Sequence, residues 1–318
     1  MKLLTILLSG SVLLTLCLPL VAADQPAAIN ALLGYKPTDK LLIINGDDAG
    51  MCYSANLAVI GALEQGVLTG ATIMTPCPWF PHIAEYAVKH PDRDFGVHLT
   101  LNAEWGSYRW GPVAGRSAVP KLCDPQGYLW DDVAPLYQHG SPEEAYVEAK
   151  AQVERALAAG IDITHLDSHM GSLQYSEPYF QVYLRLAKEY DLPLREASQE
   201  LLERMGGSQR RAQERAAGIL APDYLMHGMR KEGEPVEVYW KRILRQEIKP
   251  GCTELYIHPN LPSDEIKAIT GSWQDRAKEY NLFTNDQEVR QILRDQGIIL
   301  VKYRQLRDAQ RKLRKTSA

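Results

Sequence analysis

Two adjacent carboxylates, Asp47 and Asp48, stand at the end of an apolar run in the sequence LLIINGDDAG, residues 41–50. Like charges at the tip of a buried strand repel each other and are costly to bury, so we expect a cation to lie beside them. Asp and Gly also commonly end strands, and an ordinary turn is therefore the alternative interpretation. The polar residues at the ends of the other apolar segments decide between the two.

Three later apolar segments end in polar side chains as well. They hold His98 in 95–102, His165, Asp167 and His169 in 161–171, and His258 in 253–260. In parallel α/β folds the carboxyl ends of the strands meet on one face of the sheet, where catalytic sites are assembled. We therefore expect these side chains to lie with the two carboxylates, and a site is favoured over a turn.

The chemistry of such a set is that of a metal-dependent hydrolase. One carboxylate and two imidazoles hold one divalent metal ion, with Mg²⁺ and Zn²⁺ as the favoured identities, and leave positions open for water and substrate. Because Asp47 and Asp48 leave the backbone in different directions, one can bind the ion while the other accepts a proton from the reacting water. The sequence leaves open which does which.

The histidine segments divide into ligands and supporting groups. His98 is expected to be a ligand because several polar groups on separate strand ends rarely converge without a task. His169, the last of its group before the loop, is best placed to reach into the site as a second ligand. Asp167 is expected to orient a histidine from behind. His165 either supports the site in the same way or packs in the core.

The elements that must position these groups alternate between strand and helix. We predict strands at 41–50, 70–76, 95–102, 161–171, 192–198, 253–260 and 298–303, and helices at 53–66, 80–90, 142–160, 176–190, 235–248 and 285–296. This alternation predicts a parallel sheet covered by helices. The chain of 318 residues is long enough to form one large α/β domain.

Two segments lack a periodic pattern. Residues 103–140 predict a long insertion after the third strand, without helix or strand, and residues 199–234 predict a surface excursion. The insertion concentrates aromatic side chains, among them Trp105, Tyr108 and Trp110, which are suited to cover the apolar face of a sugar. An equally favoured alternative is a loop that packs on its own aromatic residues.

One basic residue, Arg195, lies in the predicted strand 192–198. We predict that it holds the substrate. The alternative is a structural ion pair with an acid such as Glu196. The sequence leaves both open.

Residues 1–23 combine Lys2, an apolar run and the sequence Val-Ala-Ala, which predicts a secretory signal peptide cleaved before Asp24 and export to the periplasm or the medium. An uncleaved membrane anchor is the alternative, but the apolar run is short and Pro19 interrupts it. No stable membrane span is expected after cleavage. We divide the remainder into one catalytic domain, 24–303, and a basic tail, 304–318.

Without residues 1–23 the chain carries 34 basic and 39 acidic residues, a balance that disfavours nucleic acid as a partner. The tail is the exception, because 302–315 holds seven Lys or Arg and a single Asp, and a solvated helix is favoured there over a membrane-surface segment. Four cysteines remain whose wide spacing resembles neither a disulfide framework nor a zinc cluster. A homo-oligomer is compatible with the sequence.

The ordered motifs NGDDAG, GVHLTL, HLDSHMG and IHPN resemble those of the YdjC-like carbohydrate deacetylases across most of 41–303. Each motif is weak alone, whereas the ordered set is fairly specific. In the family, further histidines often follow the DSH step; here Met170 and Gly171 follow, which leaves the substrate more open than the reaction.

The resemblance implies a (β/α) barrel-like, TIM-barrel-related fold, in which the barrel can be incomplete or distorted. It also implies removal of an N-acetyl group from an amino sugar or oligosaccharide with the help of a divalent ion. Carried over by motif, Asp47 is the base, His258 is the acid, and the metal ligands are Asp48, His98 and His169. Two alternatives keep part of this reading: an ester or phosphoester hydrolase on the same scaffold, and an exported sugar-binding protein that has lost catalysis.

Overall fold

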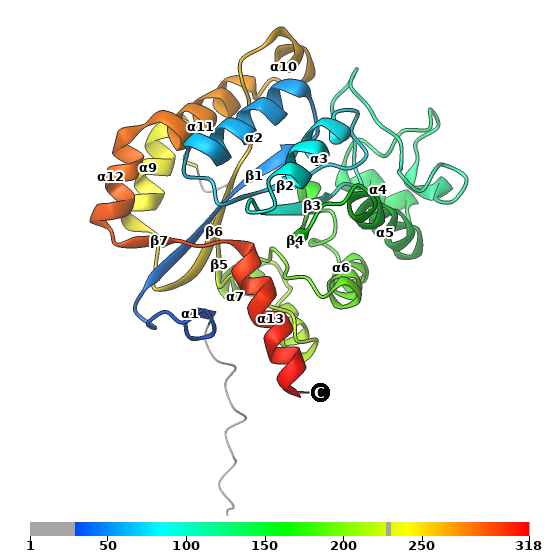
Figure 1. The fold of residues 1–318 in the computed structure, drawn as a ribbon. Helices are drawn as coiled ribbons and strands as arrows, with labels where there is room; N and C mark the ends of the chain where they lie inside the picture. Colours follow the sequence, from blue (N-terminus) through cyan, green and yellow to red (C-terminus); the bar gives the residue numbers. More distant parts are fainter. Residues whose placement is uncertain (1–28, 227–229, 318) are drawn as a thin grey trace, which may run out of the picture.

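The computed structural model describes residues 29–226 and 230–317 (Figure 1). The predicted signal peptide, residues 1–23, lies outside the described residues. Within the described part of the chain, no helix is long and apolar enough to cross a membrane.

A curled, fully parallel sheet forms the centre of the molecule, as predicted (Figure 1). Its strands are β1 Lys40–Ala49, β2 Gly70–Ile73, β3 Phe95–Leu99, β4 Ile163–Ser168, β5 Tyr224–Met226, β6 Gly251–Ile257 and β7 Ile298–Leu300. The strand order is β4-β3-β2-β1-β6-β5, with β7 paired to the start of β1. The fold is therefore α/β and barrel-like, and β1 is its central strand.

Helices cover both flanks of this sheet. They are α1 Ile29–Leu32, α2 Tyr53–Gln65, α3 Phe80–Lys89, α4 Val133–His139, α5 Pro142–Ala158, α6 Glu177–Tyr190, α7 Gln199–Arg204, α8 Arg210–Ala216, α9 Val236–Gln246, α10 Asp264–Ile269, α11 Trp273–Asn285, α12 Gln287–Asp295 and α13 Tyr303–Ser317. Figure 1 shows α2, α9, α11 and α12 together on one flank and α4, α5 and α6 on the other. The loops at the carboxyl ends of the strands are left to form a site.

Both faces of β1 are buried, which explains its continuous apolar sequence. Leu42 and Ile44 pack in the large core beneath the flanking helices. Leu41 and Ile43 alternate with them and pack in a second core with Leu306 of α13. The predicted C-terminal helix is thus present as α13. It was predicted to be solvated, but its first turns pack against the sheet.

The predicted strand 192–198 is wrong as a ladder strand. The chain makes a single parallel bridge there, between Leu194 and Leu166 of β4. On its other side, the amide of Leu194 donates to the carbonyl of Leu220. Pro193 has no N–H group to donate to β4, so the pairing does not extend into a ladder, and the barrel is distorted where a regular strand would follow β4.

Short helices account for the other corrections. The insertion 103–140 contains α4 and a 3₁₀ turn, residues 199–234 contain α7, α8 and β5, and the stretch interpreted as a loop before residue 285 contains α10 and α11. These helices are mostly one to two turns long, which is shorter than the window over which apolar periodicity can be recognised. Caps start some of them: Asp132 accepts from the first amide of α4, and Ser198 accepts from Leu201 in α7.

Candidate active site

The end of β1 separates the two neighbouring carboxylates. The pairing of β1 with β2 shifts register between Gly46 and Ala49, and Asp48 adopts a positive φ of 65°. Irregularities of this kind redirect a side chain, and Asp tolerates the left-handed region better than most residues. As a result Asp47 and Asp48, both buried, enter different sets of contacts.

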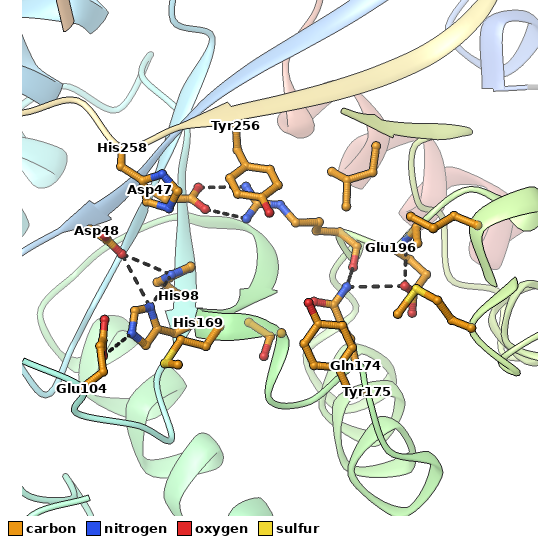
Figure 2. Close-up of a pocket in the computed structure, with 18 of the residues that line it drawn as sticks. Asp47, Asp48, His98, Glu104, His169, Gln174, Tyr175, Glu196, Tyr256 and His258 are labelled. Atoms are coloured by element: carbon orange, nitrogen blue, oxygen red, sulfur yellow. Dashed lines mark hydrogen bonds and ion pairs between the residues drawn. The ribbon is translucent and has the colours of Figure 1, made fainter. Parts of the chain in front are cut away.

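The first set, which we call the strand-end cluster, consists of Asp48, His98 and His169 (Figure 2). Oδ1 of Asp48 lies 3.4 Å from Nε2 of His98 and 3.6 Å from Nδ1 of His169. The two imidazole nitrogens are 3.1 Å apart. Three side chains from β1, β3 and the turn after β4 therefore direct one ligand atom each toward a common point.

This geometry fits a divalent cation. Oδ1 of Asp48 is buried and has no hydrogen-bond partner among the described residues. Two imidazole nitrogens that face each other at 3.1 Å need a proton or a cation between them. One carboxylate oxygen with two imidazole nitrogens is a donor set that Zn²⁺ and related divalent ions accept, with positions left open.

Another three possible ligand atoms lie close together, on Asp47, His98 and Asp167, but they fit a cation less well. Its atoms already have partners: Nδ1 of His98 lies 2.7 Å from Oδ1 of Asp167, and Asp47 accepts hydrogen bonds from Asn45, Thr72 and Arg195. The orphaned oxygen of Asp48 marks the strand-end cluster as the better metal site.

Each member of the strand-end cluster is held by a charged group behind it. Oδ1 of Asp167 accepts from Nδ1 of His98 at 2.7 Å, and Oε2 of Glu104 lies 2.9 Å from Nε2 of His169. Nη1 of Arg276 donates to Oδ2 of Asp48 at 2.7 Å, which leaves Oδ1 to face the histidines. Such contacts fix the orientation of ligands and tune a metal site.

The same neighbours set the charge of the two histidines. Burial alone lowers the pKa of His98, but Asp167 and the aspartates of β1 raise it to about 10. Burial likewise opposes the charge on His169, whereas Glu104 and Asp48 raise its pKa to about 9. These acidic neighbours favour the protonated form of the pair, and a divalent ion would take the place of the proton between the two rings.

Asp47 belongs to the other set of contacts, which we call the polar core. It consists of five residues: Arg195, Asp47, Asp167, Glu254 and Tyr303. Arg195 donates to both oxygens of Asp47 at 2.6 and 2.8 Å and to Oε1 of Glu254 at 2.8 and 2.9 Å, and its Nη1 forms an ion pair with Oδ2 of Asp167 at 2.8 Å. The Tyr303 hydroxyl donates to the other oxygen of Glu254. The guanidinium group thereby contacts three buried carboxylates.

This network explains the charge of Asp47. Burial raises the pKa of its carboxyl group, but the paired Arg195 guanidinium outweighs burial and holds that pKa well below its usual value. Arg195 itself is 3 % exposed, and its ion pairs are with Asp47, Asp167 and Glu254, not with Glu196. The predicted contact of Arg195 with substrate stays a prediction. The ion pair that the structure shows holds Asp47 in place.

His165 packs in the barrel interior. Its ring stacks on Tyr303 at 3.7 Å with an angle of 6° between the planes, and Nδ1 lies 2.9 Å from the Thr164 hydroxyl. A Cβ on Gly96 would come within 2.7 Å of the ring, so glycine is required beside it. Burial and then Arg195 hold the pKa of His165 well below its usual value, and the neutral ring acts as packing.

His258 follows β6 and faces the same cavity as Asp47 and Asp48 (Figure 2). Its backbone amide donates to Oε2 of Glu279 at 2.8 Å. Glu279 and Arg276 lie one turn apart on α11, so this helix holds both His258 and Asp48. Neither contact could be predicted from the sequence, because α11 was not predicted as a helix.

A cavity of about 430 Å³ opens from the strand-end cluster. The predicted substrate-binding residues Trp105, Tyr108 and Trp110 are not among the residues that line it. Trp105 and Trp110 are buried and pack edge to face at 5.4 Å, and the Tyr108 hydroxyl donates to the carbonyl of Met51. These contacts favour the alternative in which the insertion packs on its own aromatic residues.

Three contributing residues were absent from the sequence-based site. Glu104 lies two residues after the predicted strand 95–102, and Glu254 interrupts the apolar run of the predicted strand 253–260, so both carried a recognisable signal. Arg276 carried none, because its partner lies 228 positions away.

Comparisons with known proteins identify one family. The family model described as "YdjC-like protein" matches residues 41–295. A carbohydrate deacetylase of Thermoanaerobacter pseudethanolicus is 26% identical over 267 residues, covering 83% of this chain and 98% of the relative. A carbohydrate deacetylase of Brevibacillus brevis is 29% identical over 265 residues, covering 83% of this chain and 99% of the relative.

The fold has a counterpart among solved structures. The crystal structure of protein EF3048 from Enterococcus faecalis V583 superimposes with a TM-score of 0.73 at 28% sequence identity. The match covers 84% of this chain and 99% of that chain. The barrel-like fold of this chain is therefore also found in a solved protein that it matches over almost the whole of that protein's length.

Proposed function

The chain belongs to the YdjC-like family, and from this premise we propose that it is a metal-dependent carbohydrate deacetylase, a hydrolase that releases acetate from N-acetylated amino sugars or oligosaccharides. The single observation that carries the proposal is the unpartnered Oδ1 of Asp48, which faces one nitrogen each of His98 and His169. The names of the relatives support the substrate class.

In this proposal Asp48, His98 and His169 hold one divalent ion. The ion would lower the pKa of a water molecule and polarise the acetyl carbonyl. The protein supports it from behind, because Asp167, Glu104 and Arg276 fix the three ligands before substrate arrives.

Asp47 is the proposed general base. Arg195 keeps it ionised, so it is ready to accept the proton of the attacking water. The bidentate contact also fixes the plane of the Asp47 carboxylate, and Asp47 lines the cavity.

His258 is the proposed general acid. Cleavage of an amide bond needs a proton on the departing amine, and His258 lines the same cavity from the end of the neighbouring strand, β6. Glu279 holds the backbone of His258 in place.

The test is acetate release from a panel of N-acetylated mono- and oligosaccharides by metal-stripped protein, with Zn²⁺, Mg²⁺, Co²⁺ or Ni²⁺ added back. We expect turnover that needs a metal, is abolished by a chelator, and is lost in Asp48→Asn. No release with any metal would overturn the proposal; saturable sugar binding that a chelator does not affect would instead identify a binding protein without catalysis. Release of phosphate or an alcohol from other esters would identify a different hydrolase.

We also propose, from the sequence of residues 1–23, that the mature protein acts after export. Fractionation of cells that express the full chain should place it outside the cytoplasm, with an N-terminus at Asp24. Retention of the full-length chain in the cytoplasm would exclude this.

A further inference from the structure

The start of the insertion, residues 104–108, is tied to the turn that carries Asp48. The amide of Tyr108 donates to the carbonyl of Trp105 at 2.9 Å, which closes a turn within this segment. The Tyr108 hydroxyl donates to the carbonyl of Met51, and the amide of Met51 donates to the carbonyl of Asp48 at 3.1 Å. The segment is thereby held beside the strand-end cluster.

The indole ring of Trp105 packs beside two charged groups of the site. Its centroid lies 6.1 Å from that of the His169 imidazole, and the guanidinium carbon of Arg276 lies 5.7 Å from the indole centroid. Arg276 in turn donates to Oδ2 of Asp48 at 2.7 Å. Trp105 therefore contacts one proposed metal ligand, His169, and reaches a second one, Asp48, through Arg276.

The contact with Arg276 leaves this guanidinium few orientations. Trp105 is 8 % exposed, and the negative face of a buried indole attracts a cation. At its edge the guanidinium donates from Nε to the Ser272 hydroxyl at 3.1 Å and from Nη1 to Asp48. An aromatic face and two fixed hydrogen bonds together determine which oxygen of Asp48 Arg276 occupies, and Oδ1 is left to face the histidines.

The residue before Trp105 contacts the same histidine. Oε2 of Glu104 lies 2.9 Å from Nε2 of His169, whereas Nδ1 of this ring faces Asp48 (Figure 2). Two consecutive side chains of the insertion thus contact His169, one by an ion pair and the other by ring packing. Trp110 packs edge to face on Trp105 at 5.4 Å, so the insertion also supports the indole itself.

We propose that Trp105 is a positioning residue of the metal site, which orients His169 by ring packing and Asp48 through Arg276. The inference rests on the proposed function, because it requires that the strand-end cluster hold a metal ion. It gives Trp105 a role in the reaction other than the sugar contact that the aromatic sequence of the insertion suggested.

The test is titration of the metal-free protein with Co²⁺, whose visible absorption bands report the geometry of its ligands. Trp105→Ala should lower the affinity for Co²⁺ by about tenfold and change the shape of the bands, because two ligands lose their orientation. Trp105→Phe keeps an aromatic face for Arg276 and should retain the band shape, with an affinity within about threefold of the wild type.

Two further variants separate positioning from packing. Trp105→Leu fills much of the space without an aromatic face and should act as Trp105→Ala does, with a far-ultraviolet circular dichroism spectrum like that of the wild type. Trp130→Ala is the matched control, since Trp130 belongs to the same insertion but stacks on His139 at 4.6 Å and donates to the carbonyl of Lys121. Equal losses of Co²⁺ affinity in Trp105→Ala and Trp130→Ala, or no loss in Trp105→Ala, would overturn the positioning role.

A double-mutant cycle tests the path through Arg276. In an Arg276→Met background, Trp105→Ala should lower the Co²⁺ affinity by only about threefold, because the contact with the guanidinium is already absent. The same tenfold loss in both backgrounds would show that Trp105 does not act through Arg276.

Metal binding and acetate release, measured on the same proteins, separate this proposal from the proposed function. At saturating metal, Trp105→Ala should lower kcat by about tenfold and leave KM within about twofold, since Trp105 is not among the residues that line the cavity. Co²⁺ binding that depends on Trp105, without acetate release from any N-acetylated sugar, would overturn the deacetylase proposal and keep the positioning role. Metal-dependent acetate release with an unchanged Co²⁺ spectrum in Trp105→Ala would do the reverse.

Discussion

The polar core and the strand-end cluster are built from similar residue types but differ in how far their polar atoms are satisfied. In the polar core, Arg195 makes four hydrogen bonds to Asp47 and Glu254 and an ion pair with Asp167. In the strand-end cluster, Oδ1 of Asp48 has no hydrogen-bond partner among the described residues and faces two imidazole nitrogens. Buried polar groups whose hydrogen-bonding capacity is used by the protein are suited to hold a fixed charge. A group with an unused buried oxygen is suited to bind a cation.

His98 connects the two regions. Its Nδ1 contacts Asp167 of the polar core at 2.7 Å, and its Nε2 faces Asp48 and His169. The polar core thereby fixes which nitrogen is left for a cation. Both neighbouring aspartates are therefore paired with an arginine. Both oxygens of Asp47 accept from Arg195, whereas only Oδ2 of Asp48 accepts from Arg276, and its Oδ1 is left to face the two histidines.

The strongest test of the comparison is to remove the negative charge of each aspartate in a separate variant. Asp48→Asn should remove the metal and lower acetate release by about 10⁴-fold, because a ligand is lost. Asp47→Asn should keep a full metal content while losing activity by about 10³-fold, because only the base is lost. Metal analysis and kinetics on the same samples check this. Loss of metal in Asp47→Asn alone would reverse the assignment.

Arg195→Met tests the polar core. Three carboxylates would be left buried without their cation, and the free energy of unfolding should fall by about 3–5 kcal/mol. Arg276→Met is the control, since it removes one ion pair from Asp48 at a partly accessible position and should cost about 1–2 kcal/mol. Urea unfolding of the metal-free proteins measures both. Equal losses would show that the polar core is not a distinct unit.

Glu279 is a third kind of buried carboxylate, because it accepts hydrogen bonds from neutral groups only. These are the backbone amide of His258 and the indole N–H of Trp240. Burial raises its pKa from 4.5 to about 7. The folded protein thus binds this proton more tightly than the unfolded chain does, and the stability it confers is complete below pH 4.5 and lost as the pH rises through 7.

The wild type should therefore lose about 3 kcal/mol relative to Glu279→Gln between pH 4.5 and 8. Urea unfolding of both proteins across this range is the measurement. Parallel stability curves for the two proteins would mean that Glu279 is ionised throughout.

The smallest expected effects concern the groups behind the two histidines. Asp167→Asn should weaken metal binding by about 100-fold and Glu104→Gln by about tenfold, because Asp167 is fully buried and the Glu104 side chain is 21 % exposed. Competition with a chromophoric chelator measures both affinities. A larger loss in Glu104→Gln would show that the polar core does not control the cluster.

Most strands and the location of the site could be predicted from the sequence. The apolar runs of β1, β3, β4 and β6 are each long enough to be recognised, and each ends in a carboxylate or a histidine. Since parallel strands place their carboxyl ends on one face, the convergence of Asp48, His98 and His169 followed from the order of the elements.

The roles of individual side chains were less accessible. Arg195 and His165 stand at positions that suggest contact with substrate or with a ligand, yet the structure places them in ion pairs and ring packing. The aromatic residues of the insertion are suited to a sugar site, yet Trp105 and Trp110 pack on each other. In each case the residue type was informative about the kind of contact but not about the partner.

The sequence by itself determined the parallel α/β order, the strand-end position of the polar residues and the family to which they belong, because these depend on local pattern and chain order. The tertiary structure alone decided which protein groups hold each aspartate. That outcome depends on Arg195 and Arg276, which lie 148 and 228 positions from their partners. Electrostatic pairing in a buried site is fixed by distance in space, and local sequence does not encode that distance.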